Sequence, residues 1–186
     1  DDGNVHVRTI AVGAHAVQPE GVVYTLALSS EGVATSLSVI AAPASVGQLA
    51  FFGWSVENVG DVDGDGIVDL MVGAPFAESS NPFRLAGAVV LVFMRTNGSD
   101  KGAVVIPEPQ GQLDSPFFGS GVALLDGRDG DSALTEVVVG ALGDKNGGAL
   151  TVGAVFVLNI RGQGANVSYV KISDSLNGGP DLEGGG

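Results

Sequence analysis

Residues 51–75 read FFGWSVENVGDVDGDGIVDLMVGAP, and this stretch decides the fold. It begins with an aromatic-glycine phrase, continues into an acidic loop and ends in Gly-Ala-Pro. A phrase similar to the first, Phe51–Val56, recurs at Phe117–Val122, and the glycines of the two phrases, 53 and 119, are 66 residues apart. The last phrase, Leu70–Pro75, resembles Ile10–Ala14 and Val137–Leu142, and its glycine recurs at 13, 73 and 140. Because two separate phrases keep their order and spacing, the sequence predicts a repeat architecture.

Glycine accounts for 30 of the 186 residues and is spread between short Val, Leu, Ile and Phe runs. This pattern is typical of short strands joined by tight turns, so we expect an all-β protein without long helices. A strand led by glycine follows each Gly-Ala phrase, at Gly21, Gly87 and Gly153. The strand candidates are residues 21–28, 67–72, 88–94, 136–139 and 154–160.

The chain carries 8 Lys and Arg against 21 Asp and Glu, a formal net charge of −13. This balance argues against nucleic acid or an anionic membrane as a partner and favours cations. The sequence has no cysteine, which excludes disulfides, zinc-thiolate sites and thiol chemistry. The longest strongly apolar run, Ala88–Met94, is too short to span a bilayer, so we expect no direct membrane insertion by these residues.

The repeated phrases resemble the FG-GAP repeats of the integrin α-subunit β-propeller. Phe52-Gly53 and Phe118-Gly119 carry the first element, and Gly73-Ala74-Pro75 carries the second. The other two copies depart from the pattern, with His15 and Leu142 in place of the proline. The resemblance implies about three four-stranded antiparallel blades of a β-propeller, which is partial or completed by neighbouring chains. We expect one FG-GAP region over residues 1–186, with approximate blades at 1–47, 48–113 and 114–186.

The acidic loop places carboxylates at its first, third, fifth and ninth positions, with glycines between them. Calcium takes six to eight oxygen ligands, and alternate loop residues can turn their oxygens toward one ion. An EF-hand would need an acidic ligand at position twelve, which is Val72, and flanking helices. The spacing therefore predicts a Ca²⁺ loop, which is similar to the β-hairpin calcium loop of FG-GAP blades, and the alternative is a solvated acidic turn. The predicted ligands, which the resemblance also implies, are Asp61, Asp63, Asp65, the Ile67 carbonyl and Asp69.

The equivalent loop of the third copy is longer and contains an arginine. It predicts a weaker metal site, with Asp126, Asp129, Asp131 and Glu136 as candidate ligands. The first copy begins at Asp1-Asp2-Gly3-Asn4 and has Thr9 in the last ligand position, so it is not predicted to bind metal.

No arrangement of residues predicts catalysis. The two histidines, His6 and His15, lie in one repeat, and no Gly-x-Ser-x-Gly elbow or Walker-type phosphate loop is present. Ser55 and Ser120 are predicted to pack in strands. We therefore expect a protein that is not an enzyme. The single tryptophan, Trp54, is predicted to fill a blade interface beside Phe51 or Phe52.

Two sequons, Asn97-Gly98-Ser99 and Asn166-Val167-Ser168, are candidate N-glycosylation sites in exposed turns. Together these features favour a secreted or cell-surface, calcium-binding structural or adhesion module. Its partners would be a protein or glycan ligand, or further copies joined through open blade edges. Two alternatives remain open, a self-assembling glycosylated surface fibre subunit and the non-catalytic propeller segment of a secreted hydrolase.

Overall fold

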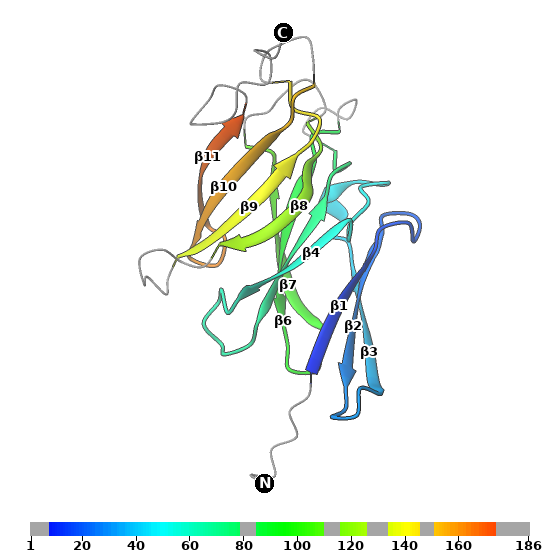
Figure 1. Ribbon diagram of the computed structural model, residues 1–186. Coiled ribbons are helices and arrows are strands. Elements are labelled where there is room, and N and C mark those ends of the chain that lie inside the picture. Colours follow the sequence, from blue (N-terminus) through cyan, green and yellow to red (C-terminus); the bar gives the residue numbers. More distant parts are fainter. Residues whose placement is uncertain (1–7, 79–84, 110–115, 126–133, 146–150, 174–186) are drawn as a thin grey trace.

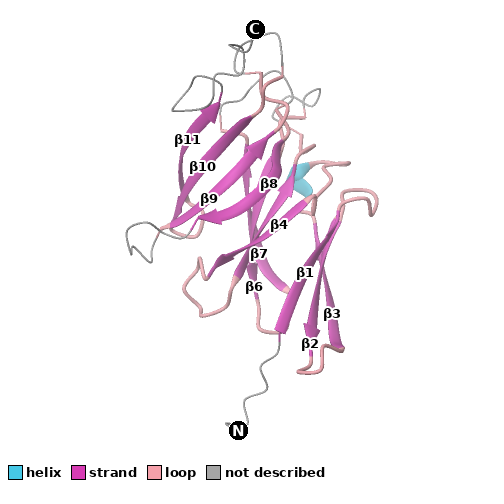
Figure 2. Ribbon diagram, viewed as in Figure 1, coloured by secondary structure: helices cyan, strands magenta, loops and turns pink. Residues whose placement is uncertain are grey.

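The computed structural model describes residues 8–78, 85–109, 116–125, 134–145 and 151–173 (Figure 1). Within these ranges the regular structure consists of strands and one 3₁₀ turn at Ala44–Val46, as Figure 2 shows. The prediction of an all-β fold is confirmed, and each predicted strand range overlaps an observed strand. No helix in the described part of the chain is long and apolar enough to cross a membrane.

Within the described residues, eleven strands form three antiparallel sheets, each a meander in chain order. Sheet 1 contains β1 (Arg8–Ala14), β2 (Val22–Leu28) and β3 (Ala34–Ala41). Sheet 2 contains β4 (Ser55–Gly60), β5 (Asp69–Ala74), β6 (Ala88–Met94) and β7 (Asp100–Pro107). Sheet 3 contains β8 (Phe118–Leu125), β9 (Thr135–Ala141), β10 (Ala154–Arg161) and β11 (Asn166–Ser173). Sheets 2 and 3 thus have the predicted four strands, whereas the described part of sheet 1 has three.

The repeated Gly-Ala phrases occupy equivalent places in the three sheets. They form β1, β5 and β9, which pair with the glycine-led strands β2, β6 and β10. In sheets 2 and 3 a further strand, β4 or β8, pairs with the other edge of the Gly-Ala strand and follows a Phe-Gly turn. The described residues of sheet 1 contain no such strand beside β1.

Sheet 2 lies between the other two and buries both of its faces (Figure 1). Side chains alternate along β6, so that Val90 and Val92 enter the core shared with sheet 1, while Val89 and Leu91 enter the core shared with sheet 3. Strand β5 is buried at all six positions. Burial on two faces explains why β6 is an uninterrupted apolar run, and each such side chain contributes about 1.5–3 kcal/mol.

The backbones of neighbouring sheets meet where a Gly-Ala strand faces the Phe-Gly turn of the next sheet. A Cβ on Gly13 would overlap the carbonyl of Gly53, and a Cβ on Gly73 would overlap the carbonyl of Gly119. The Ser55 hydroxyl also donates to the Gly119 carbonyl, at 3.0 Å. The two repeated phrases therefore keep their spacing because they touch in space.

Trp54 follows Gly53 at the junction between sheets 1 and 2, but it does not fill this junction. Its ring is 6.2 Å from Phe51 and 4.8 Å from His15, so its place beside Phe51 was predicted correctly. Its side chain is 42% exposed, and the prediction that it is buried is wrong. Phe52 already fills the core, and the positive φ of Gly53 turns the chain so that the indole lies on the rim.

Gly73→Ala should therefore separate sheets 2 and 3. We expect its free energy of unfolding to fall by about 2 kcal/mol or more, because the added methyl group overpacks against backbone that cannot move aside. Gly140→Ala is the matched control, since a Cβ at this equivalent position of sheet 3 meets nothing closer than the Ser120 hydroxyl at 3.3 Å. Urea unfolding measures both variants, and equal losses would contradict the packing described here.

Candidate metal-binding loop

The acidic loop joins β4 to β5, two antiparallel neighbours in sheet 2. Strands flank it on both sides, which confirms the hairpin setting that separates it from an EF-hand. A register shift between Asn58 and Gly60 lets the chain leave the ladder just before the loop.

The loop wraps around the carboxylate of Asp61, which accepts hydrogen bonds from three backbone N–H groups of the loop. Its Oδ1 accepts the N–H groups of Gly64 and Asp65 at 2.7 and 3.0 Å, and its Oδ2 accepts the N–H of Gly66 at 2.7 Å. Gly64 and Gly66 have φ values of 80° and 84°, which residues with a Cβ adopt at a cost. The glycines are therefore required by the turn itself, whether or not an ion is bound.

The winding brings three carboxylates together. One ligand oxygen each from Asp61, Asp63 and Asp65 lies within 4.8 Å of the other two. The Asp63 side chain is only 12% exposed, and its Oδ1 is buried without a hydrogen-bond partner among the described residues. A buried carboxylate oxygen without a donor is costly, so its position favours a cation as its partner.

Lys101, at the start of β7, reaches the same cluster. Its Nζ lies 2.7 Å from Asp63 Oδ2 and also pairs with Asp65 Oδ2. The hydrogen bond from Lys101 is the main reason that the pKa of Asp65 lies below its ordinary value, and the Ile67 N–H acts in the same direction. The same two carboxylates raise the pKa of Lys101. Sequence reasoning missed this residue, which is 36 positions from Asp65 and part of no repeated phrase.

Asp69 is not one of the three clustered carboxylates. It is fully buried at the start of β5, where its Oδ2 accepts the Val62 N–H and its Oδ1 accepts the Met94 N–H, both at 2.9 Å. Burial raises the pKa of its carboxyl group, against the lowering effect of these two hydrogen bonds. Asp69 therefore ties the end of the loop to β6, and its predicted role as a ligand stays a prediction.

Ile67 also has a structural role in this arrangement. Its N–H donates to Asp65 Oδ1 at 2.9 Å, and its side chain packs against the core between sheets 1 and 2. Its carbonyl, which was predicted to bind the ion, stays a predicted ligand.

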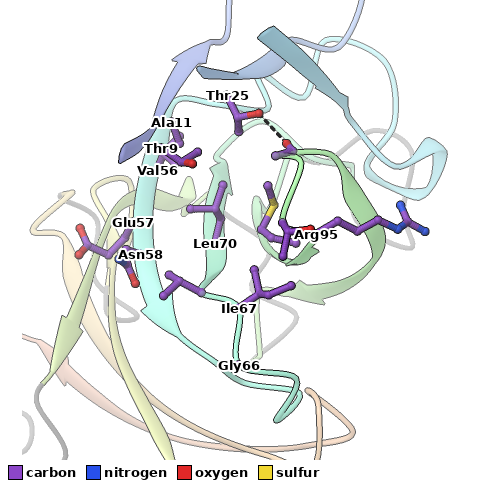
Figure 3. Close-up of a pocket in the computed structure, with 14 residues that line it drawn as sticks. Thr9, Ala11, Thr25, Val56, Glu57, Asn58, Gly66, Ile67, Leu70 and Arg95 are labelled. Atoms are coloured by element: carbon purple, nitrogen blue, oxygen red, sulfur yellow. Dashed lines mark hydrogen bonds between the residues drawn. The ribbon is translucent and has the colours of Figure 1, made fainter. Parts of the chain in front are cut away.

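A cavity of about 600 Å³ opens beside the loop, between sheets 1 and 2. Figure 3 shows Ile67 and Leu70 among the side chains that line it, with the hydrogen bond from Thr25 to the Gly98 carbonyl at one side. The loop thus lies at the rim of an inter-sheet groove.

The weaker predicted metal site falls largely outside the described residues, since Asp126, Asp129 and Asp131 lie there. Glu136 is described, half-buried on β9 opposite Leu125. Both sequon asparagines are exposed. Asn97 lies in the turn between β6 and β7, where its Oδ1 accepts the Ser99 N–H at 3.0 Å, and Asn166 begins β11.

The family comparison agrees with this geometry. The FG-GAP repeat family model matches residues 52–92, from buried Phe52 through the acidic loop to β6. The match confirms the resemblance to an FG-GAP repeat over residues 52–92. Its three antiparallel sheets are consistent with the blades of a propeller.

Asp69→Ala should destabilise the module even without metal. The change leaves the N–H groups of Val62 and Met94 without their acceptor, and we expect the free energy of unfolding to fall by about 2–4 kcal/mol. Asp69→Asn keeps one side-chain acceptor, so its free energy of unfolding should fall by clearly less. Urea unfolding in a chelator measures both, and equal losses would show that the two backbone bonds are not what Asp69 contributes.

Proposed function

We propose that this FG-GAP module is an extracellular structural or adhesion module whose acidic loop binds Ca²⁺. The ion has a rigidifying role and performs no chemistry. The observation that carries the proposal is the buried Oδ1 of Asp63, which has no hydrogen-bond donor although it lies beside two further carboxylates. An unpaired carboxylate oxygen in such a cluster is the donor type that Ca²⁺ prefers.

The local charge also suits a divalent cation. Asp61, Asp63 and Asp65 carry three negative charges, and Lys101 offsets one of them. The remaining charge of −2 has the same magnitude as the charge of Ca²⁺ and the opposite sign. Asp61, Asp63 and Asp65 would hold the ion, which would neutralise their repulsion and fix the loop. Lys101 would thus partly neutralise the negative charge of the loop in the absence of metal, and it would compete with Ca²⁺ for the same carboxylates.

The same chemistry supports an extracellular setting. A loop with three clustered carboxylates and a competing ammonium group fits the weak class of calcium sites, which bind at about 10⁻⁴–10⁻³ M and are filled outside cells. The two exposed sequons support this location, since secreted chains can carry glycans there. Protein or glycan ligands are the partners expected of such a module.

Asp63→Asn tests the proposed site. Replacing the carboxylate by an amide should weaken Ca²⁺ binding at least tenfold in isothermal titration and abolish the rise in melting temperature that Ca²⁺ gives the wild type. Glu31→Gln, in an exposed turn of sheet 1, removes the same charge away from the loop and should leave both readouts unchanged. A wild-type protein whose melting temperature is the same in excess Ca²⁺ and in chelator would overturn the proposal.

Lys101→Met tests the competition. Removing the ammonium group leaves three uncompensated carboxylates, so Ca²⁺ should bind roughly tenfold more tightly while the metal-free protein becomes less stable. Lys101→Arg keeps the positive charge and should stay close to the wild-type affinity. Weaker Ca²⁺ binding by Lys101→Met would mean that Lys101 supports the site instead of competing for it.

A further inference from the structure

The junction between sheets 1 and 2 can be compared position by position with the junction between sheets 2 and 3. In sheet 1, Ala11 of β1 pairs with Thr25 of β2. In sheet 2, Met71 of β5 pairs with Leu91 of β6. Each pair stands two residues before the junction glycine of its Gly-Ala strand and faces the next sheet. The two pairs therefore occupy equivalent positions.

A turn glycine of the next sheet supports this equivalence. A Cβ on Gly98 would lie 3.1 Å from the Thr25 Oγ1, and a Cβ on Gly164 would lie 3.3 Å from the Leu91 Cδ2. Both glycines have positive φ, 80° and 81°, and they are 66 residues apart, which is also the spacing of the Phe-Gly phrases. The two junctions therefore differ at this point in their side chains and share the path of the backbone.

The paired side chains differ greatly in size. Met71 and Leu91 are completely buried and fill the core between sheets 2 and 3. Ala11 and Thr25 are much smaller, and both line the cavity of about 600 Å³ between sheets 1 and 2. Packed protein layers rarely leave a void of this size. The small pair in sheet 1 therefore accounts for part of the cavity, because the equivalent junction fills that space with a methionine and a leucine.

The wall that sheet 2 contributes to the cavity is apolar. Val56, Leu70 and Met94 line it, and Leu70 and Met94 are buried. Figure 3 shows Leu70 pointing into the cavity. An occupant would therefore cover apolar side chains that the small pair of sheet 1 leaves uncovered, and this is the usual source of affinity in a small-molecule pocket.

The charged residues of the described lining, Glu57 and Arg95, do not contribute charge to the interior. Figure 3 shows their charged groups directed away from the cavity. The Arg95 guanidinium group donates instead to the carbonyl of Asp100. A charge that enters an apolar cavity without a partner is costly. The lining therefore fits an uncharged molecule.

Thr25 supplies a buried polar group to this cavity, since it is only 2% exposed. Its hydroxyl donates to the Gly98 carbonyl, the hydrogen bond drawn in Figure 3. A hydroxyl group has one donor and can accept as well, so the Thr25 oxygen is left with accepting capacity. A molecule that reaches Thr25 must therefore bring a hydrogen-bond donor.

We propose that this cavity binds an uncharged small molecule with an apolar body and one hydrogen-bond donor, such as a hydroxyl group. The apolar body would take the place that the side chains of Met71 and Leu91 occupy in the other junction. The donor would meet the oxygen of Thr25. The volume agrees with this class of ligand, since small-molecule pockets measure about 300–1,000 Å³.

The test uses N-phenyl-1-naphthylamine, an uncharged apolar dye with one N–H donor, titrated into the full chain and followed by its fluorescence. We expect saturable binding. Ala11→Met combined with Thr25→Leu installs the pair of the other junction, so it should weaken dye binding at least tenfold. The same double variant should melt at a higher temperature, because its side chains fill the void.

The matched control is Leu37→Thr, which removes apolar surface at a residue of β3 that is 60% exposed and does not line the cavity. It should bind the dye like the wild type. All titrations are made in a chelator. The inference does not rest on Ca²⁺ binding, and the two proposals therefore fail independently.

Ala11→Met alone keeps the proposal falsifiable if the double variant does not fold, since it adds a single side chain beside the cavity. Circular dichroism establishes that the variants are folded, and Ala11→Met should still weaken dye binding severalfold. Unchanged dye binding by a folded Ala11→Met protein would place the dye elsewhere and overturn the proposal. Loss of binding in Leu37→Thr, or no saturable binding by the wild type, would overturn it as well.

Discussion

The close approach of two backbones at each sheet junction is the constraint on which the rest of this structure depends. Gly13 and Gly73 admit the carbonyls of Gly53 and Gly119 only because they have no side chain. Once these atoms are in contact, the apolar faces on either side are brought to packing distance, and sheet 2 can bury both of them. A side chain at either glycine would hold the sheets apart and forfeit that burial.

The acidic loop obeys a different constraint, which is electrostatic. Its three clustered carboxylates would repel one another, yet the loop keeps them together by pairing Asp61 with backbone N–H groups and by drawing Lys101 from β7. These contacts leave one oxygen of Asp63 without a donor. The backbone hydrogen bonds therefore form the loop and leave the cluster with a net negative charge, and it is this charge that the proposed ion would neutralise.

The sequence predicted what local chemistry decides. Repeated phrases marked the strands, and the Asp and Gly spacing of the loop marked a tight acidic hairpin. The sequence did not predict the contacts between distant segments. Nothing in residues 61–69 indicates that Lys101 enters the loop, or that Asp69 lies between two backbone N–H groups. Trp54 was misjudged for the same reason, since its exposure depends on the turn at Gly53 and on Phe52 having filled the core.

Strand β5 links the loop to the junction. Asp69 at its beginning is fixed by hydrogen bonds to the loop and to β6, and Gly73 near its end meets the carbonyl of Gly119. A slip of one residue would exchange the two faces of this fully buried strand and would bring a side chain to the place of Gly73. Whatever fixes the loop therefore also fixes the register in which sheets 2 and 3 can meet. A Ca²⁺ ion bound as proposed would therefore stabilise the packing of sheets 2 and 3 without touching it.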